Sequence, residues 1–258
     1  MTIDLVRRFT PEEEELAAKR EQLARLVSQL ADKELLLAGL KAELATFEGL
    51  YLRRVGVLYA ELDEWNARLA ELRAEYADTP EAKAAAAEAR TQAEDAYSAA
   101  HGEAAEFQPF SPSADLKKLY RDAAKRVHPD TATDETDRAR RERLMKQVNA
   151  AYATGDEDAL RRILAGLDTS PDAVQGTGID ADLIRVLRQL KQIRGRIAAI
   201  ELEIKHLSEA DLAQLKAKAD LATAEGRDLL QEMAASVQVR VIAARQQFEK
   251  ESTSVADR

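Results

Sequence analysis

The chain has 258 residues and a formal net charge of −9, and 45% of its residues are hydrophobic, 33% charged and 5% aromatic. The acidic balance argues against a general nucleic-acid binder, which normally carries a basic excess. Cysteine is absent, which excludes disulfide scaffolds, zinc ribbons and thiol nucleophiles. The histidines, His101, His128 and His206, lie far apart without ligand spacing, so we expect no metal site and no cofactor.

The composition also indicates the fold class. Ala, Leu, Glu, Arg and Lys are abundant while Gly and Pro are scarce, as in long helices and coiled coils. The N-terminal stretch MTIDLVRRFTPEEEE lacks the apolar run of a signal peptide, and no apolar segment is long enough to span a bilayer. We therefore expect an all-α protein of the cytoplasm that binds neither membranes nor nucleic acid.

Residues 1–105 are expected to form an N-terminal helical or coiled-coil arm. Thr10 can cap a helix that begins at Pro11, and Glu13 is placed to complete a capping box. Apolar residues then recur in alternating steps of three and four, which is the heptad seam of a coiled coil. The seam consists of Leu23, Leu26, Leu30, Leu37, Leu40, Leu44, Phe47 and Tyr51, with Lys33 in its one polar position.

The spacing of this seam changes near Tyr51. Two successive steps of four, from Phe47 to Tyr51 and from Tyr51 to Val55, amount to a stutter that locally unwinds a supercoil. Gly56 lies beside the stutter and marks a candidate bend. One helix is nevertheless expected to continue through this point to Tyr76.

A second, alanine-rich helix is predicted over residues 81–101. Pro80 suits the first helical position, and Gly102 suits the end of the helix. The prolines of the following linker forbid a continuous helix. Phe107 and Phe110, which lie in this linker, are expected to be core residues.

Residues 106–168 are predicted to form a compact helical module. A helix is expected over Leu116–Val127, because apolar residues fall on one face by steps of three and four while the other side is basic. Pro129 disfavours helical geometry in the residue before it, so the helix should end at His128. We therefore expect His128 and Asp130 to be presented in a loop.

A return helix completes a hairpin with the first one. It is predicted from about Thr136 to Gly155, which is a suitable C-terminal cap. Asp156 is then expected to cap a last short helix, DEDALRRIL, that ends before Gly166.

These segments together resemble the J-domain of DnaJ-type co-chaperones. In that family helix II ends in a His-Pro-Asp loop and helix III carries an Asn-x-Ala-Tyr run, and KLYRDAAKRVHPD and RLMKQVNAAY match these features here. The resemblance implies a helical hairpin that docks on a DnaK-type chaperone ATPase and stimulates its ATP hydrolysis. It implies no catalytic residue in this chain, because such a domain acts by binding another protein's ATPase.

The resemblance also assigns roles to residues. It implies a docking signal made of His128, Pro129 and Asp130. It implies an electrostatic contact face made of Lys117, Lys118, Arg121, Lys125 and Arg126. It implies a small core made of Leu116, Leu119, Tyr120, Ala124, Leu144, Val148 and Tyr152.

The chain departs from the family in the segment before helix II. The Tyr-Leu-Gly stretch of the family's first helix is replaced by EFQPFSPS, so either helix 81–101 takes the place of that first helix or the module lacks one. No Gly/Phe-rich segment, cysteine-rich zinc domain or β-rich client-binding domain is visible. The pattern favours a specialised co-chaperone, in which attached segments choose where the chaperone acts.

A linker is predicted over residues 169–178 and a C-terminal coiled-coil arm over residues 179–258. The arm has a regular seam made of Leu183, Val186, Leu190, Ile193, Ile197, Ile200, Ile204 and Leu207. Ser208–Asp211 resembles a capping box and marks a break, after which the apolar pattern resumes to Phe248. Heptads alone leave open whether the two arms pair within one chain or between the chains of a homodimer.

Two functions follow as hypotheses. The first is a J-domain co-chaperone whose arms dimerise or bind an unknown client. The alternative is a coiled-coil structural or adaptor protein in which the J-like module is vestigial. An enzyme is disfavoured, because no nucleophile, glycine-rich phosphate loop or metal cluster accompanies the His-Pro-Asp tripeptide.

Overall fold

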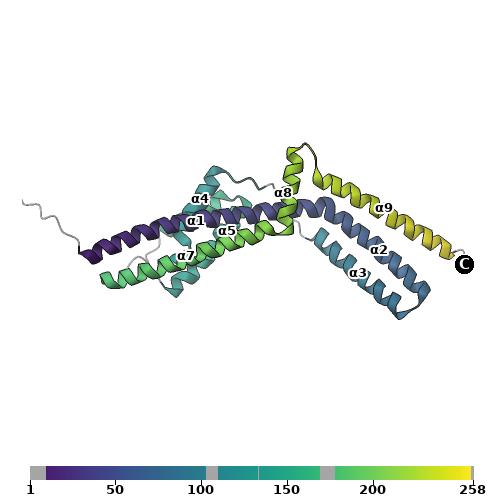
Figure 1. Ribbon diagram of the computed structural model, residues 1–258, viewed down its shortest axis with the longest axis horizontal. Coiled ribbons are helices and arrows are strands. Elements are labelled where there is room, and N and C mark those ends of the chain that lie inside the picture. Colours follow the sequence, from purple (N-terminus) through teal and green to yellow (C-terminus); the bar gives the residue numbers. More distant parts are fainter. Residues whose placement is uncertain (1–9, 103–109, 133, 169–177, 257–258) are drawn as a thin grey trace, which may run out of the picture. The chain divides into compact units, whose positions relative to one another are not determined.

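The computed structural model describes residues 10–102, 110–132, 134–168 and 178–256. All regular secondary structure in these ranges is helical, and no strand occurs in them, as the composition predicted (Figure 1). The contacts divide the chain into unit 1, Met1–Glu43 with Phe110–Glu209, and unit 2, Leu44–Pro109 with Ala210–Arg258.

These units differ from the segments expected from the sequence. Both the N-terminal arm, 1–105, and the C-terminal arm, 179–258, contribute helices to both units, and the module expected over 106–168 lies in unit 1 together with parts of the arms. Of the predicted linker, 169–178, residues 169–177 lie outside the described residues, as does Phe107.

The N-terminal arm is one uninterrupted run of helix. The helix α1 (Pro11–Tyr51) is followed directly by a π-helical turn, η1 (Leu52–Gly56), and then by α2 (Val57–Ala77). At its start the backbone N–H of Glu13 donates to Thr10 Oγ1 at 3.3 Å, and that of Thr10 donates to Glu13 Oε2 at 2.9 Å, so the predicted capping box is confirmed. The π-helical turn overlaps the end of the stutter at Val55, and its wider winding unwinds the helix locally there.

In unit 1, α7 (Ile179–Glu209) packs along α1, and the residue numbers rise together along the contact, so the two helices are parallel (Figure 1). The packed residues of the seam include Leu16, Leu23, Leu26, Leu30, Leu37, Val186, Leu190, Ile193, Ile197 and Ile200. Ion pairs flank the seam, with Lys33 Nζ 2.7 Å from Glu201 Oε1 and Lys41 Nζ 2.6 Å from Glu203 Oε1. The seams of the two arms therefore pair within the chain in this unit.

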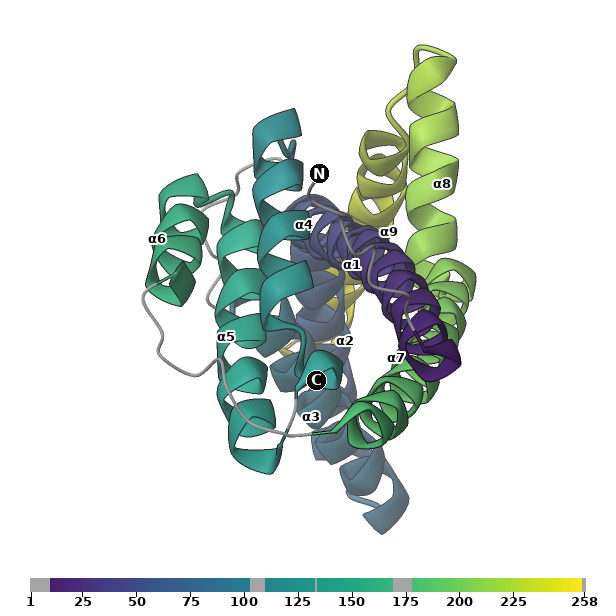
Figure 2. The same cartoon turned by 90° about the vertical axis from the view of Figure 1, so that its left-hand side faces the viewer.

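The predicted hairpin is formed by two helices, and a third short helix packs on both of them; Figure 2 shows the three side by side. They are α4 (Ala114–Val127), α5 (Glu135–Thr154) and α6 (Glu157–Asp168), with a 3-10 turn, η2 (Pro129–Thr131), after α4. The end of α5 is as predicted, because Gly155 has a left-handed φ of 72°. The prediction that the last helix ends before Gly166 is wrong, because α6 continues to Asp168.

The core of the hairpin is the one expected. Of the seven predicted core residues, five are buried and the other two, Leu119 and Leu144, are partly buried against them. The buried five are Leu116, Tyr120, Ala124, Val148 and Tyr152. Phe110 packs against the same core, as predicted, and its ring meets that of Tyr152 edge-on at 5.4 Å between centroids.

Unit 2 contains α2, α3 (Pro80–His101), α8 (Asp211–Ala224) and α9 (Leu229–Ala256). The alanine-rich α3 packs on α2 within unit 2. The helix that packs against the α4–α5 core in unit 1 is α1, through Ala31 and Leu35.

The second half of the C-terminal arm is a hairpin and not one resumed helix. Chain reversal occurs between α8 and α9, at a turn in which Gly226 has a φ of 77°. The predicted break near Ser208–Asp211 is present, but its capping box is not. Ala210 is the N-cap of α8 and makes no side-chain cap, and the hydroxyl of Ser208 donates back to Ile204 O at 2.7 Å.

Candidate functional site

The His-Pro-Asp tripeptide forms a closed turn at the end of α4. His128 has an extended backbone, with φ −63° and ψ 127°, as expected for a residue before proline. Its backbone N–H still donates to Ala124 O at 3.1 Å, while its carbonyl accepts a hydrogen bond from the Thr131 hydroxyl at 2.7 Å. Local hydrogen bonds of the backbone and of the Thr131 hydroxyl therefore close the turn.

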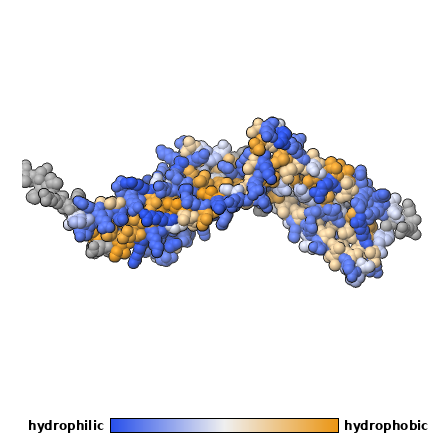
Figure 3. All heavy atoms as spheres, in the orientation of Figure 1, coloured by the Kyte–Doolittle hydropathy of each residue, from blue (hydrophilic) through white to orange (hydrophobic). Residues whose placement is uncertain are grey.

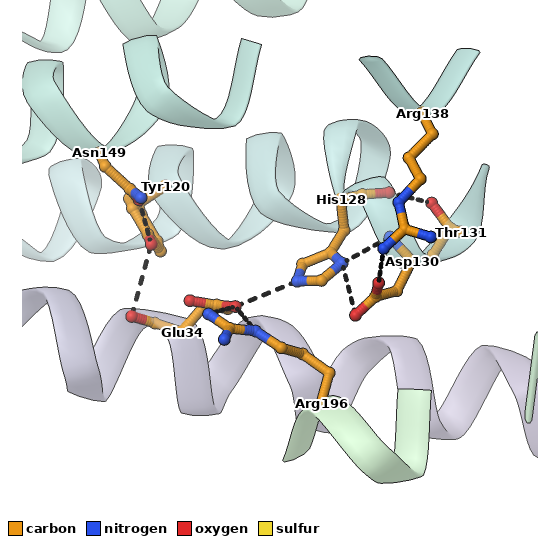
Figure 4. A network of polar contacts seen from close by, with 8 residues as sticks. All are labelled: Glu34, Tyr120, His128, Asp130, Thr131, Arg138, Asn149 and Arg196. Atoms are coloured by element: carbon orange, nitrogen blue, oxygen red, sulfur yellow. Dashed lines mark hydrogen bonds and ion pairs between the residues drawn. The ribbon is translucent and has the colours of Figure 1, made fainter. Parts of the chain in front are cut away.

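The side chain of His128 is buried and not presented to solvent, which corrects the expectation from the sequence. The residue is only 2% exposed. Its Nδ1 accepts the backbone N–H of Asp130 at 3.1 Å, so the ring hydrogen is on Nε2, which donates to Glu34 Oε1 at 3.1 Å (Figure 4). The imidazole thus joins the loop to α1. Neither Pro129 nor Asp130 is fully covered, and the Asp130 side chain is 14% exposed.

Glu34 is a buried carboxylate that accepts a hydrogen bond from His128 and pairs with the charge of Arg196. It is 5% exposed, and the same oxygen that faces His128 lies 2.9 Å from Nε of Arg196 and 2.8 Å from its second guanidinium nitrogen. Burial alone raises the pKa of Glu34, but the hydrogen bond from His128 and the charge of Arg196 outweigh it, so the net pKa lies below the ordinary value. Glu34 is therefore an ionised anchor between α4 and α7.

Tyr120 connects the same anchor to the return helix. Its hydroxyl donates to Asn149 Oδ1 at 2.8 Å and lies 3.4 Å from the backbone O of Glu34. The rings of Tyr120 and Tyr152 are tilted at 4.7 Å between centroids, and burial raises the pKa of Tyr120. The Asn-x-Ala-Tyr run thus supplies a polar partner and a ring to the same buried tyrosine of α4.

The bracing role of α1 was missed by sequence reasoning. Ala31, Leu35 and Ala38 form a second stripe beside the heptad seam and pack against the hairpin core, with Glu34 between them. The sequence does contain a signal for this contact. Leu35 is an apolar residue off the heptad seam, and Ala31 and Ala38, seven positions apart on its side of the helix, allow another helix to approach closely. Arg196 carried no such signal, since charged residues are common on the outer face of a seam helix.

The five basic residues predicted as a contact face share one helix but differ in their surroundings. Lys117, Lys118 and Arg126 are exposed, whereas Arg121 and Lys125 are partly buried. Arg121 Nε lies 2.9 Å from Asp32 Oδ1 of α1, so this residue is committed to the bracing helix. In the described part of the chain no ion pair involves Lys117 or Lys118.

Two further arginines and a glutamine hold the loop. Arg141 of α5 donates to Thr131 Oγ1 at 2.6 Å and to the backbone O of Arg126 at 3.0 Å. Arg138 lies 3.9 Å from Asp130 Oδ1, and Gln189 of α7 donates to the Thr131 carbonyl at 3.3 Å. The loop is thus contacted from α5, α1 and α7.

Metal-binding clusters and membrane-spanning helices are absent from the described residues. They contain no group of three or more His, Cys, Asp or Glu side chains placed to hold a metal ion. Among the same residues, every helix is too short or too polar to cross a membrane.

Comparisons with protein-family models, with curated proteins and with solved structures found no match to this chain. Support for a function therefore comes from the motif residues and from the geometry of the hairpin.

Proposed function

We propose that this protein is a co-chaperone whose α4–α5 hairpin docks on a DnaK-type chaperone ATPase and stimulates its ATP hydrolysis. The observation that carries the proposal is that the two motif runs meet in one core. Tyr120 and Val127, from the run that ends in His128, pack with Val148 and Tyr152 of the Asn-x-Ala-Tyr run. A chance tripeptide would not require a matching return helix at the right distance along the chain.

The surface around the loop supports docking on an acidic partner. Lys117, Lys118 and Arg126 are exposed on α4. A basic face of this kind raises the rate at which a negatively charged surface is encountered and orients it. Pro129 stiffens the turn, which lowers the entropy that a partner must remove from the loop on binding.

The remaining helices are proposed to choose the client or to mediate dimerisation. Hydrophobic patches interrupt the hydrophilic surface over α1 and α7 in Figure 3. Ile184, Leu187 and Leu202 of α7 are 51%, 43% and 58% exposed. Exposed apolar side chains on a long helix are the type of surface that a helical partner or client covers.

Steady-state ATP hydrolysis by a DnaK-type chaperone, with and without this chain, tests the proposal. We expect the chain to raise the rate, and Asp130→Asn to abolish the effect. Asp130 is the informative position because Arg138 Nη2, the arginine nitrogen that pairs with its carboxylate, is as far as 3.9 Å away, so the substitution should spare the fold. Lys146→Gln, on an exposed position of α5, is the matched control. A wild-type chain that leaves the rate unchanged overturns the proposal.

One observation favours the adaptor alternative. His128 is buried and hydrogen-bonded to Glu34, as expected of a histidine that only holds the fold together. That function predicts that Asp130→Asn changes neither ATP hydrolysis nor the capture of partners by the arms. Pull-down by chains with and without Asp130→Asn, combined with the ATPase measurement, separates the two functions.

A further inference from the structure

The loop expected to dock on the chaperone is covered by α7. Gln189 Nε2 donates to the carbonyl of Thr131, within η2, at 3.3 Å. About two turns further along α7, Arg196 reaches Glu34, the residue that holds the His128 ring (Figure 4). The side chains of His128 and Asp130 are left 3% and 14% exposed.

A partner that reads this loop needs the space that α7 occupies. Contact with the Thr131 carbonyl from the side that Gln189 occupies requires the Gln189 side chain to move away. A partner and α7 therefore compete, and each stabilises a different form of the chain.

The contacts that α7 makes are separable from those of α1. The hairpin core takes Ala31 and Leu35 from α1, whereas none of its described members comes from α7. Against the loop α7 presents polar side-chain ends, and its apolar attachment is to α1, through Ile193 and Ile200. Moving α7 therefore opens the loop without opening the core.

We propose that α7 is an intramolecular cover of the docking loop, and that the chaperone ATPase binds the form in which α7 has left η2 while α1 still braces the hairpin. This inference rests on the proposed co-chaperone function. The stimulation that is measured then depends on the fraction of molecules in which the loop is open.

A crosslink that holds α7 on α1 tests the cover. The chain has no native cysteine, so Lys33→Cys with Glu201→Cys gives one specific pair, at positions whose side chains are 2.7 Å apart. Bridging them with a short bifunctional thiol reagent keeps the loop closed. The matched control is Arg73→Cys with Glu251→Cys, bridged in the same way, which ties α2 to α9 within unit 2 at another ion pair, 2.6 Å long.

The opposite change loosens the cover. Ile193→Ala removes a fully buried seam contact of α7, and Gln192→Ala, at an exposed position of the same helix, is its control. Circular dichroism establishes that each variant retains its helices. Stimulation of a DnaK-type ATPase is then measured at a chain concentration below saturation.

We expect the 33–201 crosslink to lower stimulation by about tenfold or more and Ile193→Ala to raise it severalfold, as a shift in the open fraction requires. Both controls should behave as the wild type. Full stimulation by the 33–201 crosslinked chain overturns the cover and leaves the co-chaperone function standing. If neither the wild type nor Ile193→Ala stimulates the ATPase, the co-chaperone function fails, and the cover with it.

Discussion

Nε2 of His128 lies 3.1 Å from Oε1 of Glu34, a residue 94 positions earlier in the chain. The bond ties the His-Pro-Asp loop to α1 and aligns the ring so that its other nitrogen accepts the N–H of Asp130. The conformation of the loop therefore depends on a helix outside the segment in which the motif lies.

Removing this carboxylate should destabilise the fold. Glu34→Ala leaves His128 Nε2 and the Arg196 guanidinium without their acceptor in a buried place, and we expect a loss of about 1–3 kcal/mol in the free energy of unfolding. Glu34→Gln keeps an acceptor and should cost less. Urea unfolding measures both, with Glu201→Ala, in an exposed ion pair, as a near-neutral control. Equal stability of Glu34→Ala and wild type would contradict this account.

Glu34 should also make the stability of the fold depend on pH. The folded pKa of Glu34 lies below its ordinary value of 4.5, so the folded protein favours the ionised form. The ionised Glu34 therefore makes its full contribution to the free energy of unfolding above pH 4.5. That contribution is lost as the pH falls through the lower folded pKa. We expect the difference in unfolding free energy between wild type and Glu34→Gln to shrink as the pH is lowered from 7 towards about 3. A difference that is constant over this range would show that the charge of Glu34 does not contribute.

The bond between Tyr120 and Asn149 should contribute to the hairpin core. Tyr120→Phe keeps the buried ring and removes the donor, and we expect a loss of about 1 kcal/mol. Adding Asn149→Ala to Tyr120→Phe should cost less than the two single changes together, because the singles remove the same bond. Thermal unfolding of the four proteins of the cycle measures this coupling. Tyr97→Phe, at a position that is 61% exposed, is the control, and additive losses would disprove the coupling.

Charge reversal on α4 should slow docking without affecting the fold. Lys117 and Lys118 are exposed, so Lys117→Glu with Lys118→Glu should leave thermal stability nearly unchanged. We expect the association rate constant with a DnaK-type chaperone to fall by roughly tenfold at low salt, and the effect to weaken as salt is added. Surface binding kinetics at two ionic strengths measure it. Lys146→Glu on α5 is the control, and an equal effect there would argue against a specific face.

Local features were predictable from the sequence because they depend on neighbouring residues. Proline at Pro11 and Pro129, the cap at Thr10 and the glycine at Gly155 set the ends of helices through backbone geometry. Heptad spacing likewise predicted which faces of α1 and α7 are apolar, and the stutter predicted local unwinding near Tyr51, where the structure has the π-helical turn Leu52–Gly56. The turn at Gly226 was missed because apolar residues occur at helical spacing both before it, at Leu212 and Leu215, and after it, at Leu230 and Met233.

Periodicity and capping are local, so most helices, the faces that they bury and the core of the hairpin were predictable from the sequence alone. Which helix braces that hairpin, and whether the loop is covered, depends on packing between segments far apart in the chain. The alanine-rich α3 packs in unit 2, and α1 supplies the brace, because a heptad seam specifies an apolar face but not the element that covers it. Glu34 and Arg196, 162 positions apart, meet at His128 only once α1 and α7 have paired.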